Sequence, residues 1–328
     1  MHSKRVIFIP KGSTNYIVNY LNKDGNRLNF IDYYIINSIG YPQAGWIDLK
    51  DTKMSKYDYL FKICTSKAAL RNVTLVPGET YYYFLEDISK KLGIDFNRLL
   101  EVYYKKRYKL DGNILPQTYS LPIGMKPNDV ISYLFKYTHD KYKAYSLKIF
   151  GKYEKENWFK YVTIASVIQK ESANNKEMPI VSSVIYNRLE KNMKLQMDGT
   201  LNYGKFSHVA VTPKMIRNDK SSYNTYKKSG IPDSPVCAVA FDAIKAAIFP
   251  KKTNYLYFVK KPNKKEHIFT TNLANHNKEL RKYKKSLRNQ KKKNMPKRAK
   301  KLPNETKSKK VIPKANIKDL WKNVNTGN

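Results

Sequence analysis

One carboxylate, Glu171, stands at the end of an apolar stretch that begins at Trp158. At helical spacing, Ile164, Val167 and Ile168 lie seven, four and three residues before it and share its face. Because burial disfavours the charged form, a carboxyl group among such side chains has a raised pKa. A carboxylic acid that is still protonated near neutral pH can act as a general acid. The alternative is a helix-end glutamate whose carboxylate lies in water.

The length of the chain limits how many units can position this acid, and its charge limits the classes of ligand. A chain of 328 residues is long enough to bury a large core and to hold two or three units. Its net charge is +37, and the stretch from Arg281 to Asn328 has 18 Lys/Arg against two acids. Such a surface favours polyanions: nucleic acid, anionic lipid or an acidic polymer such as peptidoglycan. Charge alone does not choose among these three.

The sequence predicts no cofactor and no metal. Cys64 and Cys237 form no disulfide framework, and the five histidines lack zinc-ligand spacing. No apolar run reaches the roughly 18–20 residues of a membrane span. The patch Val6–Ile9 is too short for the core of a signal peptide.

Two small units precede the acid. Residues 1–68 alternate short strands and helices, which predicts a small α+β module. Residues 69–136 predict a strand, a Gly-Glu-Thr turn, a helix to Leu92, a glycine and a second helix over 95–104. This order resembles the LysM carbohydrate-binding unit, a small βααβ module, although many α+β units share the same rhythm. The Pro-rich connector 112–122 leads into a helix over 127–142.

The remaining chain divides into a mixed α+β catalytic domain, residues 137–284, and a basic tail, 285–328. In the domain we expect helices over 158–171 and 179–191 and strands over 256–260 and 268–270. The tail has few apolar groups, so we expect it to be disordered, with Leu320 and Trp321 as a short partner-binding element.

From residue 163 on, the chain resembles the YceG-like (MltG) endolytic murein transglycosylases. The resemblance rests on eight stretches in the family's order: Thr163–Ser172, Val184–Leu189, Met193–Gly204, Ser222–Tyr226, Gly230–Pro232, Ala243–Pro250, Tyr255–Val259 and His267–Asn277. Earlier stretches fit more loosely: Ile9–Ser13, Val76–Thr80 and Leu115–Tyr119.

The resemblance implies a lyase that cuts the β-1,4 bond from N-acetylmuramic acid to N-acetylglucosamine in nascent peptidoglycan strands. Such an enzyme leaves 1,6-anhydro ends on the cut strands and thereby stops elongation of the strand. The family's catalytic glutamate falls on Glu171. A single acid can suffice, because the substrate's own 6-hydroxyl attacks the anomeric carbon and returns a proton to the same glutamate. In keeping with one principal acid, Gln169 is neutral where the family often has a second glutamate.

Several polar groups could bind the sugars. In the turn after the second helix, Gln196 and Asp198 could bond a hydroxyl or an acetamide, or could simply cap the turn. The stretch Tyr223, Asn224, Thr225 and Tyr226 combines rings with hydrogen-bonding groups, a mixture that suits sugars. Asn272, His276 and Asn277 either lie near a cleft or cap a helix.

The chain departs from the family pattern at several positions. Asp198-Gly199 replaces a usual Asp-Pro pair, Gln117 replaces a common Asp, and the loop 230–241 is rebuilt, which puts sugar contacts there in doubt. Family members normally begin with a membrane-spanning helix, and none is present here. The sequence therefore starts downstream of its anchor, or the protein is held by its basic tail, or it is not held at all.

The resemblance also implies a place at the inner membrane, with the catalytic part facing the periplasm. The expected partners are glycan strands, peptidoglycan synthases (penicillin-binding proteins) and, through the basic tail, an anionic membrane surface. Two other functions stay open: a non-catalytic peptidoglycan-binding scaffold for synthases, and a nucleic-acid-binding protein. The second is suggested by charge alone, without an aromatic-basic RNA motif, so we expect no specific nucleic acid.

Overall fold

The first unit pairs one short sheet with three helices. The computed structural model describes residues 1–294 except 24 and 263. In this unit strand β1 (Val6–Ile9) pairs antiparallel with β2 (Gly45–Asp48). The helices are α1 (Thr14–Lys23), α2 (Phe30–Ile39) and α3 (Lys56–Thr65). Their apolar faces form one core, which includes Ile9, Ile17, Ile36, Ile47 and Leu60. The predicted α+β character of this stretch is confirmed.

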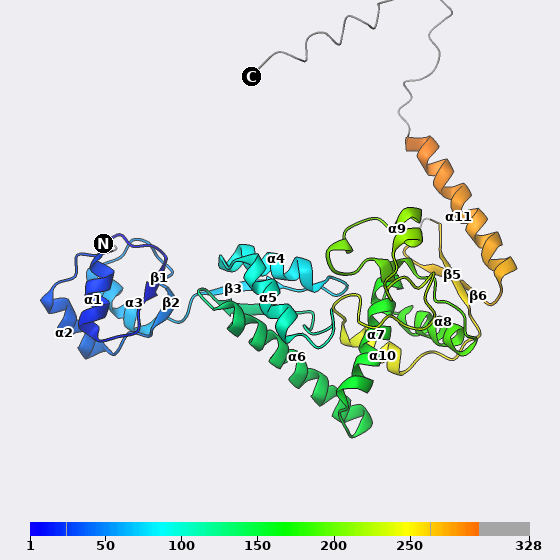
Figure 1. Ribbon diagram of the computed structural model, residues 1–328. Coiled ribbons are helices and arrows are strands. Elements are labelled where there is room, and N and C mark those ends of the chain that lie inside the picture. Colours follow the sequence, from blue (N-terminus) through cyan, green and yellow to red (C-terminus); the bar gives the residue numbers. More distant parts are fainter. Residues whose placement is uncertain (24, 263, 295–328) are drawn as a thin grey trace, which may run out of the picture. The chain divides into compact units, whose positions relative to one another are not determined.

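The second unit has the order strand, helix, helix, strand. Strand β3 (Leu70–Thr74) pairs antiparallel with β4 (Thr118–Pro122), so that Val73 lies opposite Tyr119. Between them run α4 (Tyr81–Leu92) and α5 (Phe96–Lys106) (Figure 1). Gly93 ends α4 in the left-handed region, a conformation that suits glycine. The order of strand and two helices matches the expectation, whereas β4 lies in the stretch 112–122 that was predicted as a connector. The likeness to LysM stays a prediction.

A long helix, α6 (Pro127–Phe150), follows with proline in its first turn. It runs eight residues beyond Tyr142, where the sequence analysis placed its end. One face of α6 packs Val130, Ile131 and Leu134 into the core of the second unit. Farther along α6, Tyr142 belongs to the hydrophobic core of the part of the chain that carries Glu171.

The part of the chain that carries Glu171 is built around three packed helices. These are α7 (Lys155–Glu171), α8 (Met178–Glu190) and α10 (Phe241–Ile248), which share one apolar core. The loops between α8 and α10 hold η1 (Asp198–Leu201), η2 (Gly204–Phe206) and α9 (Pro213–Asn218). Strands β5 (Tyr257–Lys260) and β6 (His267–Thr270) form the hairpin that was predicted.

The last helix, α11 (Leu273–Asn294), corrects one expectation. The sequence predicted disorder from residue 285, but the chain is helical to Asn294 because Lys, Arg, Leu and Gln are good helix formers. The rest of the predicted tail, with Leu320 and Trp321, lies outside the described residues. Within residues 1–294, no helix combines the length and apolar character needed to cross a membrane.

Candidate active site

Helix α7 carries Glu171 on its last turn and is buried along most of its length. Its fully buried Ser166 accepts a hydrogen bond from the backbone N–H of Val236, at 3.0 Å. Gln169, the neutral neighbour of the acid, accepts one from the N–H of Ala240 at 3.3 Å. The backbone of residues 236–240 is thereby tied to the C-terminal half of α7. The acid is thus presented by a helix that cannot shift without breaking buried contacts.

Glu171 is held by the backbone of the loop that follows α8. Its Oε1 accepts a hydrogen bond of 2.7 Å from the N–H of Gly199, and its side chain is only partly exposed. Burial raises the pKa of Glu171 to about 7; the Gly199 N–H opposes that rise, and the negative charge of Asp198 adds to it. The expectation of a raised carboxyl pKa is confirmed, and the group can hold a proton near neutral pH.

The loop that supplies Gly199 is fixed by Arg188, a residue that the sequence analysis did not single out. Arg188 is 7% exposed, and its guanidinium donates to the carbonyls of Leu195 at 2.7 Å and Leu256 at 2.6 Å. It also lies over the ring of Tyr257, 5.0 Å from the centroid. Arg188 lies within the Val184–Leu189 stretch that carried the family resemblance, which is the only signal that could have found it.

Gln196 and Asp198 both belong to this loop and are exposed. Gln196 adopts a left-handed backbone (φ 51°), and its side-chain oxygen lies 3.5 Å from Nη1 of Arg188. Asp198 opens η1 and accepts a hydrogen bond of 2.6 Å from the hydroxyl of Tyr226. Burial raises the pKa of Tyr226, so its hydroxyl remains a donor. Asp198 and Tyr226 therefore form a polar pair beside the acid.

Tyr223, Asn224 and Thr225 are buried, unlike Tyr226. The Asn224 amide donates to the carbonyls of Ile216 and Asp219, and the Thr225 hydroxyl accepts from the N–H of Met197. The Tyr223 ring stacks on Tyr203 with centroids 4.1 Å apart. These three side chains pack within the protein and hold the loop segments around Met197 and Asp219 in place. Because they are buried, the direct sugar contacts that the sequence suggested for them do not fit the structure.

Asn272 and His276 lie at the start of α11. The Asn272 side chain accepts from the N–H of Asn275 at 2.9 Å, so it caps the helix, as one of the two sequence hypotheses held. His276 stacks on Tyr257 at 5.3 Å, and burial lowers its pKa. Tyr257 thus lies between His276 and Arg188, which links this end of the site to the Gly199 loop.

A second set of contacts, also missed from the sequence, joins residues 204–208 to the start of α4 and to the end of α7. The Thr80 hydroxyl donates to the Gly204 carbonyl at 2.9 Å, and Lys170 donates to the Ser207 hydroxyl at 2.9 Å. His208 lies 2.8 Å from a Glu79 oxygen and stacks on Tyr83 at 3.7 Å. Glu79 and Thr80 belong to the Val76–Thr80 stretch. That stretch resembled the family loosely and so offered a signal.

The described residues contain no group of three or more His, Cys, Asp or Glu side chains arranged to hold a metal ion. The chemistry that the site can perform rests on a protonated Glu171, with the negative charge of Asp198 acting on it and the Tyr226 hydroxyl bonded to Asp198.

Comparison with known proteins identifies relatives of the chain. The chain is 35% identical to the endolytic murein transglycosylase of Bacillus subtilis over 179 residues, 54% of this chain and 49% of that protein. It is 28% identical to the enzyme of the same name from Streptococcus pneumoniae over 182 residues, 33% of that protein. The chain thus matches half or less of the length of these curated relatives.

A solved structure shares the fold. The crystal structure of a YceG-like protein from Listeria monocytogenes covers 84% of this chain and 99% of its own, with a TM-score of 0.55 and 24% identity. The YceG-like family itself matches residues 7–282, which is most of the chain. The chain therefore belongs to the YceG-like family.

Proposed function

We propose that this chain is an endolytic peptidoglycan lytic transglycosylase that cuts the β-1,4 bond between N-acetylmuramic acid and N-acetylglucosamine in nascent strands and ends their elongation. The observation that carries the proposal is the half-buried Glu171, whose pKa is raised to about 7 at the end of a rigid helix. The names of the Bacillus and Streptococcus relatives support the same activity.

In the first step, protonated Glu171 donates its proton to the oxygen of the glycosidic bond as that bond breaks. The sugar carbon that loses the oxygen becomes cation-like. In the second step, the 6-hydroxyl of the same sugar attacks this carbon, and the carboxylate of Glu171 accepts the hydroxyl proton. The product is a 1,6-anhydro ring, no water is consumed, and the acid regains its starting form.

Asp198 and Tyr226 contribute through charge and position. The negative charge of Asp198 helps to keep Glu171 protonated before the reaction. The same charge favours the cation-like sugar during it. Tyr226 fixes Asp198 through its 2.6 Å hydrogen bond and leaves part of its ring exposed for the apolar face of a sugar. Exposed Gln196 is placed to bond a hydroxyl or an acetamide.

The substrate class implies the protein's surroundings. We place the catalytic part on the outer side of the cytoplasmic membrane, where nascent strands are made, and infer peptidoglycan synthases as neighbours. The +37 net charge supports attraction to the carboxylates of stem peptides and to anionic lipid headgroups.

The test is Glu171→Gln, assayed on nascent strands with products identified by mass spectrometry. The intact chain should give anhydro ends and the variant should give none, while circular dichroism shows a folded protein. Reducing ends, heavier by one water, would identify a hydrolase and contradict the mechanism. A variant that still supports cell-wall synthesis in vivo would instead favour the non-catalytic scaffold.

A further inference from the structure

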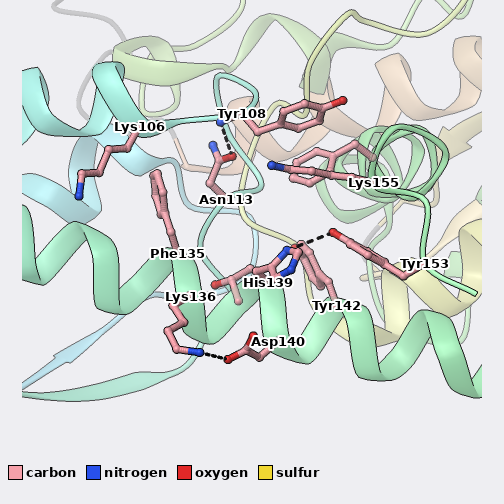
Figure 2. Close-up of a pocket in the computed structure, with 12 residues that line it drawn as sticks. Lys106, Tyr108, Asn113, Phe135, Lys136, His139, Asp140, Tyr142, Tyr153 and Lys155 are labelled. Atoms are coloured by element: carbon pink, nitrogen blue, oxygen red, sulfur yellow. Dashed lines mark hydrogen bonds and ion pairs between the residues drawn. The ribbon is translucent and has the colours of Figure 1, made fainter.

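A separate pocket of about 390 Å³ lies where the end of α5, the middle of α6 and the start of α7 meet (Figure 2). Lys155, one of its lining residues, opens α7, whereas Glu171 closes that helix. Sixteen residues of α-helix span about 24 Å, so the pocket is well removed from the catalytic carboxyl group. None of the candidate site residues described above lines it.

The rim of the pocket is positively charged. Lys136 is neutralised by Asp140, with 2.9 Å between the ammonium nitrogen and a carboxylate oxygen. The ammonium of Lys106 donates to the neutral hydroxyl of Ser132, and the ammonium of Lys155 lies 4.1 Å from the centroid of the Tyr108 ring. Within the described residues, neither of these two lysines has a carboxylate within 4 Å that would neutralise it. Two positive charges are therefore available to a ligand.

The walls are mainly aromatic. Tyr108 packs edge-on against Phe159 with centroids 4.9 Å apart, and Tyr142 packs against the same ring at 6.2 Å. The Tyr153 hydroxyl lies 3.5 Å from Nδ1 of His139. Burial raises the pKa of Tyr153 to about 12, so at neutral pH this hydroxyl keeps its proton. Figure 2 shows Tyr108, Tyr142, Tyr153 and Lys155 arranged around the same space.

The buried polar groups of the lining are already used by the protein. The Asn113 amide bonds the Tyr108 backbone, the Lys109 carbonyl and the Tyr103 hydroxyl. The Thr138 hydroxyl donates to the Leu134 carbonyl and accepts from the N–H of Leu115. A ligand would therefore meet ammonium groups, a tyrosine hydroxyl and ring faces. Ring faces suit sugar C–H groups, and ammonium groups suit an anion.

We propose that this pocket binds a carboxylate of the peptidoglycan stem peptide, at a distance from the bond that is cut; the carboxyl group of the sugar acid is not free in a peptide-bearing strand, because it forms the amide bond to the peptide. The inference rests on the proposed function and adds a second contact with the substrate. A carboxylate fits better than a phosphate, because the lining includes no arginine to form the bidentate pair that phosphate favours. Such a contact would favour long, peptide-bearing strands over short sugars.

Binding is tested first, in the Glu171→Gln background so that nothing is cleaved. The variant Lys106→Ala/Lys155→Ala is compared with the control Lys148→Ala, which removes an exposed charge from α6 outside the pocket. The probes are a disaccharide-tetrapeptide, the disaccharide alone, the tetrapeptide alone and inorganic phosphate, measured by calorimetry. The double variant should bind the disaccharide-tetrapeptide about tenfold more weakly, since each exposed ion pair contributes up to a few-fold; the control should be unchanged.

The two single-group probes identify the source of the carboxylate. Loss of tetrapeptide binding in the double variant assigns the pocket to the stem peptide. Loss of disaccharide binding alone would overturn the proposal, because the disaccharide carries a free carboxylate that peptide-bearing strands lack. Unchanged binding of all probes would overturn the proposal. So would phosphate that binds as tightly as the disaccharide-tetrapeptide and is lost in the same variant, because the pocket would then be a general anion site.

Cleavage is tested second, with Glu171 intact. The double variant should raise KM on peptide-bearing strands with kcat unchanged, and should behave like the parent chain on strands freed of their peptides. Equal KM values on both substrates would contradict the inference while leaving the transglycosylase activity standing. If the parent chain cuts neither substrate, the proposed function fails, and the binding result is judged on its own.

Discussion

The backbone N–H of Gly199 donates a 2.7 Å hydrogen bond to Oε1 of Glu171, and no side chain larger than hydrogen fits between the two residues. A Cβ built on Gly199 would lie 2.8 Å from that oxygen and 2.7 Å from Cβ of Lys170. The resemblance to the family leads one to expect proline at this position, and proline has no N–H to donate. In this chain the loop therefore contributes a donor that fixes one oxygen of the acid.

Gly199→Ala should reduce kcat by about 10²-fold, because a shift of about 1 Å in a catalytic group has an effect of that size. The glycine is required for space, since its φ does not lie in the left-handed region. Cleavage of strands, measured alongside circular dichroism, checks this. Gly230→Ala is the control for crowding: a Cβ there meets no atom within 4 Å, so any loss in that variant comes from its left-handed backbone (φ 84°) and not from a steric clash. A fully active Gly199→Ala variant would show that the Gly199–Glu171 contact is unimportant.

Activity should fall as the pH rises through about 7. The acid form of Glu171 starts the reaction, and its pKa of about 7 means that this form predominates below that pH. Asp198→Asn removes a negative charge that favours the protonated form, so the descending limb should move to lower pH. The pH dependence of kcat/KM for both proteins gives the answer. A limb that stays in place would mean that another group controls it.

Glu171→Gln should make the protein more stable at pH 8 than the parent chain, by about 1–3 kcal/mol. The folded-state pKa of about 7 lies above the value of 4.5 for an unperturbed glutamate, so ionisation of Glu171 costs stability as the pH rises through this window. Below pH 4 the two proteins should differ little. Urea unfolding at both pH values measures the difference, and equal stability at pH 8 would argue that the carboxylate is well solvated.

The helix that carries the acid could be predicted because its apolar residues recur with the helical period and its burial follows from that pattern. The partner of the acid could not, since the Gly199 donor is a backbone N–H and leaves no side-chain signature. The role of Arg188 could not be predicted from the sequence for a related reason. A basic residue near a helix end usually lies in water, and its carbonyl partners at Leu195 and Leu256 are set only by the tertiary fold.

Asn224 shows how a sensible inference from residue type can fail. Amides that suit sugar hydroxyls suit buried loop carbonyls equally well, and the fold uses Asn224 for the second purpose. The same uncertainty had applied to Asn272, where the capping alternative is now confirmed. Residue type limits what a side chain can bond, whereas burial decides whether a ligand can reach it.

Tyr226→Phe should lower kcat/KM by roughly tenfold, the effect of losing about 1.4 kcal/mol of transition-state stabilisation. The change removes the 2.6 Å hydrogen bond to Asp198 and keeps the ring. Tyr203→Phe is a matched control, because Tyr203 makes a similar bond of 3.1 Å to Asp219, whereas the carboxylate whose charge acts on Glu171 is Asp198. Equal losses in the two variants would assign the effect to loop stability and remove Asp198 from the mechanism.

Glu177→Gln should destabilise the fold in a way that depends on pH. Glu177 is buried at the start of α8, and its carboxylate accepts bonds from the backbone N–H and from Nδ1 of His267, at 2.7 and 2.8 Å. Burial alone would raise the pKa of Glu177, but the bonds from His267 outweigh burial and lower it. The stabilisation is therefore complete above the ordinary glutamate pKa and is lost as the pH falls through the lowered value.

At pH 7 we expect Glu177→Gln to lower the free energy of unfolding by about 1–3 kcal/mol, because an amide group cannot accept from both buried donors of His267. At pH 3 the difference from the parent chain should be smaller. Asp140→Asn, which removes an exposed pair with Lys136, should cost less than about 0.5 kcal/mol at either pH. Denaturant unfolding of the three proteins measures these differences. If Glu177→Gln costs as much at pH 3 as at pH 7, the carboxylate charge does not tie the β6 strand to α8, and packing alone holds them.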